Sequence, residues 1–299
     1  MLTKNRTSVS SKPRKPVSPE VAPRSARPDV GYRRELAAAV AAARAAGRTM
    51  RENLYAPKKI NATYAHDIKL ELDVQCQAMI EKELHDRFPG ISLLGEEGDA
   101  GDSDSPQRWV VDPIDGTVNF TYGIPHACVS IALQTRVEAT AAGKTGRRPA
   151  GGGYETVVGV VFDPFCGELW TAIRGGPAYL NGQEIHVTQT TKLREALLSM
   201  GFAKARGTLE TSLPYFNQLV RRVRKVRMMG SAALALTYVA SGRFDAYVES
   251  GIRLWDIAAG GLIVECAGGE FWHEPIAGRH AYRMVASNGR LRKKLQAIG

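Results

Sequence analysis

This chain of 299 residues has a hydrophobic fraction of 44%, a charged fraction of 23% and a formal net charge of +10. Such a composition is ordinary for a globular protein of one or two domains. No apolar run approaches the roughly 18–20 residues that a membrane-spanning helix needs, which argues against membrane spans and favours a soluble, cytoplasmic protein.

Residues 1–30 carry half of the net charge, because seven Lys and Arg stand there against two acids. The segment is rich in Pro and Ser and nearly free of large apolar side chains, which predicts a disordered basic tail. It lacks the apolar core of a secretory signal. An organelle-targeting peptide is the weaker alternative, since the many prolines disfavour its amphipathic helix.

Two helices are predicted next in the chain. Order is expected to begin near Gly31, and apolar residues at spacings of three and four predict a helix over residues 34–56. A second helix is expected over residues 73–88, stopped by Pro89-Gly90. The segment "ISLLGEEG" is then typical of a short strand that enters a turn.

Strands dominate the middle of the chain. They are predicted at residues 109–111, 126–137 and 156–165, with one or two more around an Asn181-Gly182 turn. The basic, Gly-rich residues 138–153 are interpreted as an exposed insertion. Its "AAGKT" lacks the earlier glycine of a phosphate-binding P-loop, because position 138 is Glu.

From residue 195 onward strands and helices alternate. The last apolar helix, "WDIAAGGLIVEC", is expected to stop at Gly268-Gly269. Consecutive β-α-β units favour a mixed or parallel sheet covered by helices. We therefore predict a layered α/β sandwich of two halves, residues 31–185 and residues 186–299.

The four cysteines are scattered singly, without the paired spacing of a zinc site or a disulfide framework. We interpret them as small buried thiols of a reducing compartment. They are Cys76, Cys128, Cys166 and Cys266.

The stretch "WVVDPIDGTVNF" places Asp112 and Asp115 at the end of an apolar strand. Pro113 fixes the backbone and Gly116 permits a sharp turn, so both carboxylates can face one point. Carboxylates close together and partly buried must bind a proton or a cation. The plain alternative is a turn that happens to contain aspartates.

Two further apolar segments end in acids. "LGEEG" contains Glu96 and Glu97, and "LWDIAAG" places Asp256 at the start of a helix. Together these oxygens suit Mg²⁺, and a pair of such ions is a known device for phosphoryl displacement. The alternative for Asp256, and for Asp73 in the second helix, is helix capping.

The three segments "GEEG", "WVVDPIDGTVNF" and "WDIAAGGLIVECAGG", in this order, closely resemble the signatures of the inositol monophosphatase family of metal-dependent phosphatases. The similarity extends over residues 31–299 and includes "GSAALAL" and "ASGRFDAYVE". It implies an αβαβα sandwich with a metal site between the two halves, and a homodimer.

The resemblance also implies a metal-ligand set for two Mg²⁺ ions. The first ion would be held by Glu96, Asp112 and the Ile114 carbonyl, and the second by Asp112, Asp115 and Asp256. A third, weaker ion would lie near Glu96, which the resemblance also makes part of the catalytic set.

The remaining implied roles concern water and substrate. Asp73 and Thr117 would orient and deprotonate the attacking water, and the Gly116 and Thr117 N–H groups would receive the phosphate. Asp115, Asp256 and Glu249 would contact substrate, and the segment Gly230, Ser231 and Ala232 would line the sugar.

Val118 stands where relatives acting on 3′-phosphoadenosine 5′-phosphate or histidinol phosphate commonly carry Lys, so both substrates are less favoured. The resemblance favours myo-inositol 1-phosphate or a related polyol or sugar phosphate. Fructose 1,6-bisphosphatase activity, alone or as a dual function, is the alternative, with the insertion or residues 204–206 holding the second phosphate.

A non-catalytic protein that binds nucleic acid through its basic segments is the different-class alternative. It is disfavoured because the complete acid set would only destabilise a metal-free fold. The basic run at residues 221–227 lacks interleaved aromatics and is interpreted as a solvated strand face. His126 is interpreted as a structural histidine.

Overall fold

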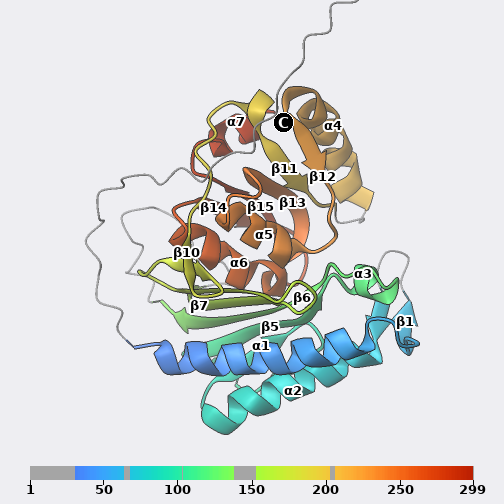
Figure 1. Cartoon of the computed structure of the whole chain (residues 1–299), viewed down its shortest axis with the longest axis vertical. Helices are drawn as coiled ribbons and strands as arrows, with labels where there is room; N and C mark the ends of the chain where they lie inside the picture. Colours follow the sequence, from blue (N-terminus) through green and yellow to red (C-terminus); the bar gives the residue numbers. More distant parts are fainter. Residues whose placement is uncertain (1–30, 64–67, 103, 138–152, 203–205, 299) are drawn as a thin grey trace, which may run out of the picture.

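The computed structural model describes residues 31–63, 68–102, 104–137, 153–202 and 206–298. The predictions for the basic tail and for the body of the insertion lie outside these residues. Within the described part, two sheets and three helical layers alternate (Figure 1). Among the described helices, none is both long and apolar enough to cross a membrane.

The first sheet has eight strands in the order β10-β9-β8-β7-β6-β5-β3-β4. Neighbouring strands are antiparallel except for β3 and β5, which are parallel. The strands are β3 (Ser92–Gly95), β4 (Asp99–Ala100), β5 (Gln107–Asp115), β6 (Cys128–Arg136), β7 (Tyr154–Asp163), β8 (Glu168–Ile173), β9 (Ala178–Leu180) and β10 (Gln183–Ile185).

The outer face of this sheet is covered by α1 (Arg33–Asn53) and α2 (Glu71–Arg87) (Figure 1). Small residues let α1 lie close to the sheet, because a Cβ on Gly47 would stand 2.6 Å from the Phe162 ring. Both helices were predicted from apolar spacing, and their existence is confirmed. A hairpin of β1 (Ile60–Thr63) and β2 (Ile68–Leu70) joins them.

The second sheet has five strands in the order β12-β11-β13-β15-β14. The strands β11, β12 and β13 are parallel, as the alternating pattern predicted, and β13, β15 and β14 are antiparallel. The strands are β11 (Leu197–Met200), β12 (Lys225–Arg227), β13 (Ala246–Arg253), β14 (Glu270–Pro275) and β15 (Ala281–Ser287).

Two apolar helices lie between the sheets, α5 (Ala232–Ala240) and α6 (Leu254–Cys266) (Figure 1). Each is buried on nearly all sides, as expected for a helix without a polar face. The outer face of the second sheet is covered by α4 (Arg206–Arg222) and α7 (Arg292–Gln296). The five layers confirm the predicted αβαβα sandwich. The division near residue 186 stays a prediction.

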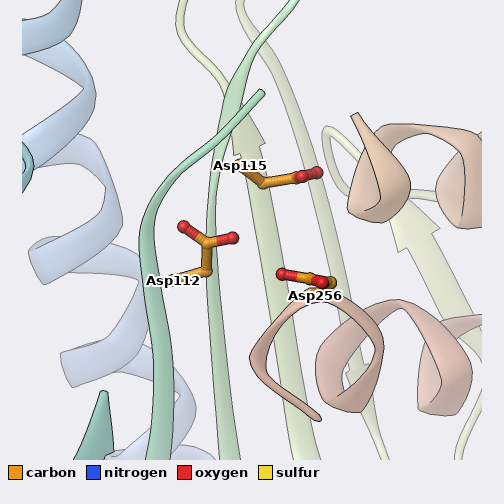
Figure 2. A group of neighbouring side chains, drawn as sticks. All are labelled: Asp112, Asp115 and Asp256. Atoms are coloured by element: carbon orange, nitrogen blue, oxygen red, sulfur yellow. The ribbon is translucent and has the colours of Figure 1, made fainter. Parts of the chain in front are cut away.

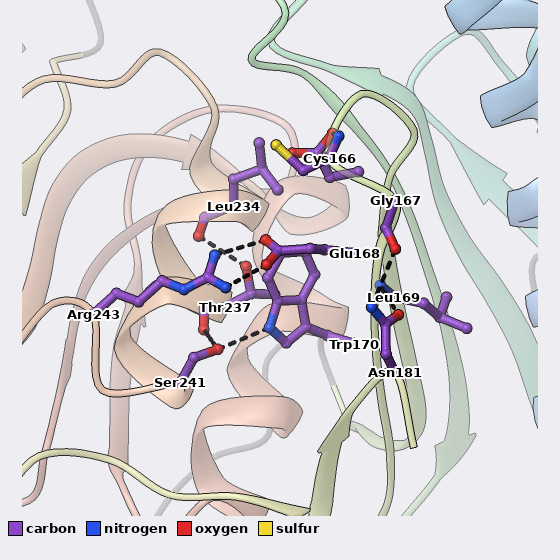
Figure 3. Close-up of polar contacts among 11 residues, drawn as sticks. Cys166, Gly167, Glu168, Leu169, Trp170, Asn181, Leu234, Thr237, Ser241 and Arg243 are labelled. Carbon is purple, nitrogen blue, oxygen red and sulfur yellow. Dashed lines mark hydrogen bonds and ion pairs between the residues drawn. The ribbon is translucent and has the colours of Figure 1, made fainter. Parts of the chain in front are cut away.

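An ion pair ties α5 to the first sheet. The Arg243 guanidinium, in the loop after α5, donates two hydrogen bonds to the Glu168 carboxylate of β8, one of 2.6 Å (Figure 3). It also lies over the rings of Trp170 and Tyr238. Beside it, Trp170 Nε1 donates to Ser241 Oγ at 2.8 Å. These contacts fix the C-terminal end of α5 against β8.

Two predictions about loops are confirmed, and one about cysteines is partly wrong. Asn181 and Gly182 have φ of 49° and 79° in the β9–β10 turn, and Gly268 ends α6 with φ of 85°. The thiols of Cys76 and Cys128 are buried, but Cys166 is exposed and Cys266 only partly buried. Cys166 follows the Asp163 turn, where the backbone has already left the sheet.

The basic run at residues 221–227 ends α4 and forms β12 at the edge of the second sheet. Lys225 and Arg227 are exposed there, so the predicted solvated strand face is confirmed for β12. Arg221 and Arg222 instead lie in the last turn of α4, where positive charge is favourable.

Candidate active site

The aspartate turn closes β5, which runs on from the predicted residues 109–111 to Asp115. The pairing of β5 with β6 is interrupted between Asp112 and Asp115, so the backbone leaves the regular ladder there. Asp112 is only 1% exposed, and its Oδ1 accepts the Ile114 N–H at 3.0 Å. Gly116 has φ of +96°, and a Cβ there would stand 2.9 Å from the His126 carbonyl oxygen. The turn therefore requires glycine at this position.

Asp115 is held by the N-terminus of α5, although 116 residues separate it from Ser231. Its carboxylate accepts hydrogen bonds from Ser231 Oγ at 2.5 Å, from the Ala233 N–H at 2.7 Å and from the Ala232 N–H at 3.2 Å. Free N–H groups at a helix start are suited to an anion. The segment expected to line the sugar thus also fixes Asp115.

Asp256 lies in the first turn of α6 and accepts the Arg253 N–H at 2.9 Å. It is a helix cap, as the plain alternative supposed, but it also faces the aspartate turn. Carboxylate oxygens of Asp112, Asp115 and Asp256 all lie within 4.8 Å of one another (Figure 2). Capping and metal binding are therefore compatible at this residue.

Glu96 lies beside the three aspartates, in contact with Asp112. It lies in the turn after β3, whose parallel pairing with β5 brings the two strand ends together. A hydrogen bond between the Glu96 and Asp112 carboxyl groups, together with the charge of Glu96, helps to raise the pKa of Asp112. The four acids that the sequence placed at three separate junctions therefore converge.

Burial raises the pKa of all three aspartates. For Asp112 the charges of Glu96, Asp115 and Asp256 add to the effect of burial. For Asp256 the charge of Asp115 is the largest cause of the raised pKa after burial. For Asp115 the donors of α5 oppose the effect of burial. Buried, mutually repelling carboxylates with hard oxygen donors suit a divalent cation such as Mg²⁺.

A cavity of about 810 Å³ opens above these carboxylates. Its lining includes the acids Glu96, Asp112, Asp115, Asp256 and Glu249, the apolar residue Ile114, and the polar or small residues Gly116, Thr117, Gly230, Ser231 and Ala232. All the expected site residues except Asp73 thus border one space that both halves of the chain build.

Asp73 is not among the residues that line this cavity. It is buried in the first turn of α2 and its Oδ2 accepts the Leu70 N–H at 2.9 Å, so it caps its own helix. The Thr117 hydroxyl donates to the Ile114 carbonyl at 2.9 Å. The proton relay between Asp73 and Thr117 therefore stays a proposal.

A sequence profile of the inositol monophosphatase family matches residues 32–143 and 153–295. The chain belongs to the inositol monophosphatase family. It is 39% identical over 237 residues to Nus factor SuhB of Xylella fastidiosa, which covers 77% of this chain and 78% of that protein. It is 38% identical over 242 residues to inositol monophosphatase 1 of Solanum lycopersicum, which covers 78% of this chain and 82% of that protein.

Solved structures agree with the fold. The suhB protein of Bartonella henselae superposes with a TM-score of 0.77 at 31% identity, covering 89% of this chain and 98% of that one. The inositol monophosphatase of Anabaena superposes with a TM-score of 0.74 at 32% identity, covering 89% and 94%. The chain is thus a phosphatase of the inositol monophosphatase family.

Several residues around this family site were missed by the sequence analysis. The Tyr247 hydroxyl donates to Glu249, two residues along β13, and a Cβ on Gly201 would overlap the Glu249 carboxylate. Burial raises the pKa of Glu249 to about 7, against the hydrogen bond from Tyr247 and with the charge of Asp115. The i, i+2 spacing of Tyr247 and Glu249 on one strand face was the available signal.

Asn119 links the aspartate turn to the segment before α5. Its Nδ2 donates to the carbonyls of His126 at 2.9 Å and Met229 at 2.8 Å. His126 itself packs edge-on against Tyr238, and burial lowers its pKa. It lies outside the cavity lining, which agrees with a structural histidine.

Proposed function

We propose that this protein is a Mg²⁺-dependent phosphomonoesterase that hydrolyses myo-inositol 1-phosphate or a related polyol or sugar phosphate. The observation that carries the proposal is the group of three aspartates, two of them buried and Asp256 partly buried, whose oxygens lie within 4.8 Å of one another in the cavity lining, with Glu96 beside Asp112. Family membership supports the same reaction class.

The residues present fit two Mg²⁺ ions. Glu96, Asp112 and the Ile114 carbonyl would hold one ion, and Asp112, Asp115 and Asp256 the other, with a third and weaker ion near Glu96. When bound, the ions neutralise the carboxylates, acidify water and stabilise charge on the phosphoryl oxygens.

The protein's own groups position the reactants. The Gly116 and Thr117 N–H groups would hold the phosphate, while Glu249 and the Gly230–Ala232 segment would face the alcohol. Thr117 and Asp73 would orient the attacking water and take its proton. The water oxygen bonds to phosphorus, the ester P–O bond breaks, and the alcohol leaves with a proton.

Fructose 1,6-bisphosphatase activity is the alternative, and it needs a cation for the second phosphate. Among the described residues that line the cavity there is no Lys, Arg or His. The candidates for that role, residues 204–206 and the insertion, have side chains outside the described part. The described lining of this cavity therefore supplies no cation for a second phosphate.

A second candidate comes from relatives named Nus factor SuhB, which are 35–39% identical to this chain. The name points to a role in a transcription complex, with or without catalysis. The convergence of the acids favours the phosphatase, because uncompensated buried carboxylates destabilise a fold.

Phosphate release from a substrate panel in Mg²⁺ tests the proposal. We expect the highest kcat/KM for inositol 1-phosphate, lower values for fructose 1,6-bisphosphate, and no turnover after chelation. Calorimetric titration with Mg²⁺ gives a readout independent of activity. Absence of both Mg²⁺ binding and phosphate release would reject the proposal and favour the binding role.

A further inference from the structure

The active-site cavity has a second, apolar region. Six of the apolar side chains that line the cavity form this region: Phe202, Leu209, Leu213, Phe216, Met228 and Met229. Phe216 and Met228 also line a smaller adjoining cavity of about 230 Å³, whose described lining contains Val220, Val226 and the basic residues Arg224 and Lys225 but no carboxylate. The apolar region therefore lies on the side of the cavity away from the acids.

Helix α4 supplies this region with a row of apolar side chains, two of which, Leu209 and Leu213, are not among those that pack in the core beneath the helix. Leu209, Leu213 and Phe216 follow one another at spacings of four and three, so they share one face of the helix. The core beneath α4 contains Leu219 and Val223, and Phe216 packs against this core as well as lining the cavity. Leu213 remains 54% exposed.

The opposite wall comes from the segment before α5, where Met228 is 59% exposed. The Phe202 and Phe216 rings meet edge-on with centroids 5.7 Å apart. Contiguous exposed apolar side chains beside a catalytic pocket are typical of a ligand site, and methionines adapt to varied shapes. The region is thus built to hold an apolar group.

We propose that this region binds an apolar substituent on the alcohol part of the substrate, an inference that rests on the proposed phosphatase function. With the phosphate at the carboxylates, the ester oxygen directs the alcohol into the remaining cavity. Hydroxyl groups placed among the six apolar side chains would lose hydrogen bonds to water without replacement. An alkyl or aryl group would instead be transferred out of water.

The substrate class is therefore a phosphate monoester whose alcohol carries an alkyl or aryl group next to, or in place of, a bare polyol. This differs from selection for a second phosphate, for which the described lining of the catalytic cavity supplies no cation. The competing occupant of the row is a second copy of this chain, and the experiment separates the two.

Ethyl, butyl and hexyl phosphate form the test series, because their leaving alcohols have similar basicity. The free energy of fully burying one methylene corresponds to a factor of about four in kcat/KM. This open region is expected to give about half of that free energy, which is roughly twofold in kcat/KM per methylene. Hexyl phosphate should then exceed ethyl phosphate by roughly 16-fold. The corresponding alkylphosphonates, which are not hydrolysed, should show the same trend in Mg²⁺-dependent affinity by calorimetry.

The double variant Leu213→Ser/Met228→Ser should reduce the hexyl-to-ethyl ratio to about one or two. Both side chains are more than half exposed, so the variant is expected to fold. The matched control is Met79→Ser, which removes an apolar side chain 40% exposed on α2 and outside the cavity. It should keep the wild-type ratio.

Three outcomes decide the matter. If inositol 1-phosphate is hydrolysed but kcat/KM is flat across the alkyl series, the apolar subsite is wrong and the phosphatase function stands. If the double variant keeps the ratio and turns a dimer into a monomer by light scattering, the row is a subunit interface. If no phosphate ester is hydrolysed and the phosphonates bind without preference for length, both proposals fail.

Discussion

Asp115 is subject to two opposing influences within one carboxylate. Burial raises the pKa of Asp115, and for Asp112 the neighbouring acids raise the pKa further. Three hydrogen-bond donors at the start of α5 stabilise the ionised carboxylate of Asp115 and oppose the effect of burial. The residue is therefore both a candidate metal ligand and the contact that fixes β5 to α5. Substitution tests these two roles separately, because they have different readouts.

Replacing Asp115 by Asn should lower kcat on the order of 10²-fold or more, since a charged ligand near the reacting phosphate is lost. The unfolding temperature without metal should change little, because relief of repulsion offsets the weakened bonds from Ser231 and Ala233. Initial rates, Mg²⁺ calorimetry and thermal melts measure these effects. An enzyme with wild-type kcat and full Mg²⁺ affinity would show that Asp115 is not a ligand.

The proposed water relay gives a second prediction at the residue scale. Thr117→Ala and Asp73→Asn should each lower kcat by about 10²–10⁴-fold with little change in KM. Because the two residues would act as a unit, the double variant should be hardly worse than either single variant. Multiplicative losses would mean that they act independently.

Asp73 needs a control for its structural role, because it accepts the Leu70 N–H at the start of α2. Asp73→Asn should therefore also cost about 1 kcal/mol of unfolding free energy, whereas Thr117→Ala should cost less. If Asp73→Asn destabilises the protein but leaves kcat unchanged, capping is its whole role.

At the scale of elements, apolar spacing and turn residues were sufficient for α1, α2, α6 and the β9–β10 turn. Their signals are local, since one helical face or one turn is encoded within a few residues. The approach of Asp256 to Asp112 is not local, because it depends on α6 packing beneath β5. The positions of the acids at the ends of apolar segments indicated a shared cation site, and the resemblance to a family supplied the pairing of Asp256 with Asp112 on one ion.

The sequence analysis also did not identify the row of apolar side chains on α4 that borders the cavity. Leu209, Leu213 and Phe216 have the spacing of a core-facing stripe that continues to Leu219, yet Leu209 and Leu213 border the cavity while Phe216 and Leu219 pack at the core. Periodicity identifies an apolar face but does not say whether sheet or cavity lies against it.

The Arg243–Glu168 pair gives a prediction at this scale, because it fixes α5 to β8 (Figure 3). Glu168→Gln should lower the unfolding free energy by about 1 kcal/mol, since the pair is bidentate but partly exposed to solvent. Chemical denaturation measures the change, and Lys82→Gln, which breaks the exposed Lys82–Asp86 pair of α2, is the control. Equal effects in the two variants would contradict a special role of the α5 contact.

At the scale of the whole molecule, the acid group joins the two halves. Asp112 and Asp115 end β5 of the first sheet, while Asp256 begins α6 after a strand of the second. Burial raises the pKa of each of these aspartates in the fold, and repulsion from neighbouring acids adds to this effect for Asp112 and Asp256. A group with a raised pKa binds more protons folded than unfolded, so the stability it contributes is lost as pH rises.

The metal-free protein should therefore become less stable as pH rises from about 4, where unfolded aspartates ionise, through the higher pKa values of the folded group. Mg²⁺ binds only the folded arrangement of ionised carboxylates, so saturating Mg²⁺ should remove this loss and raise the melting temperature most at neutral pH. Melting curves from pH 4.5 to 8, with EDTA or with Mg²⁺, measure both effects. Asp256→Asn should flatten the metal-free profile, because it removes one of the repelling charges. A pH profile that is the same with and without Mg²⁺ would mean that the three aspartates do not form a cation site, whatever their role in joining β5 to α6.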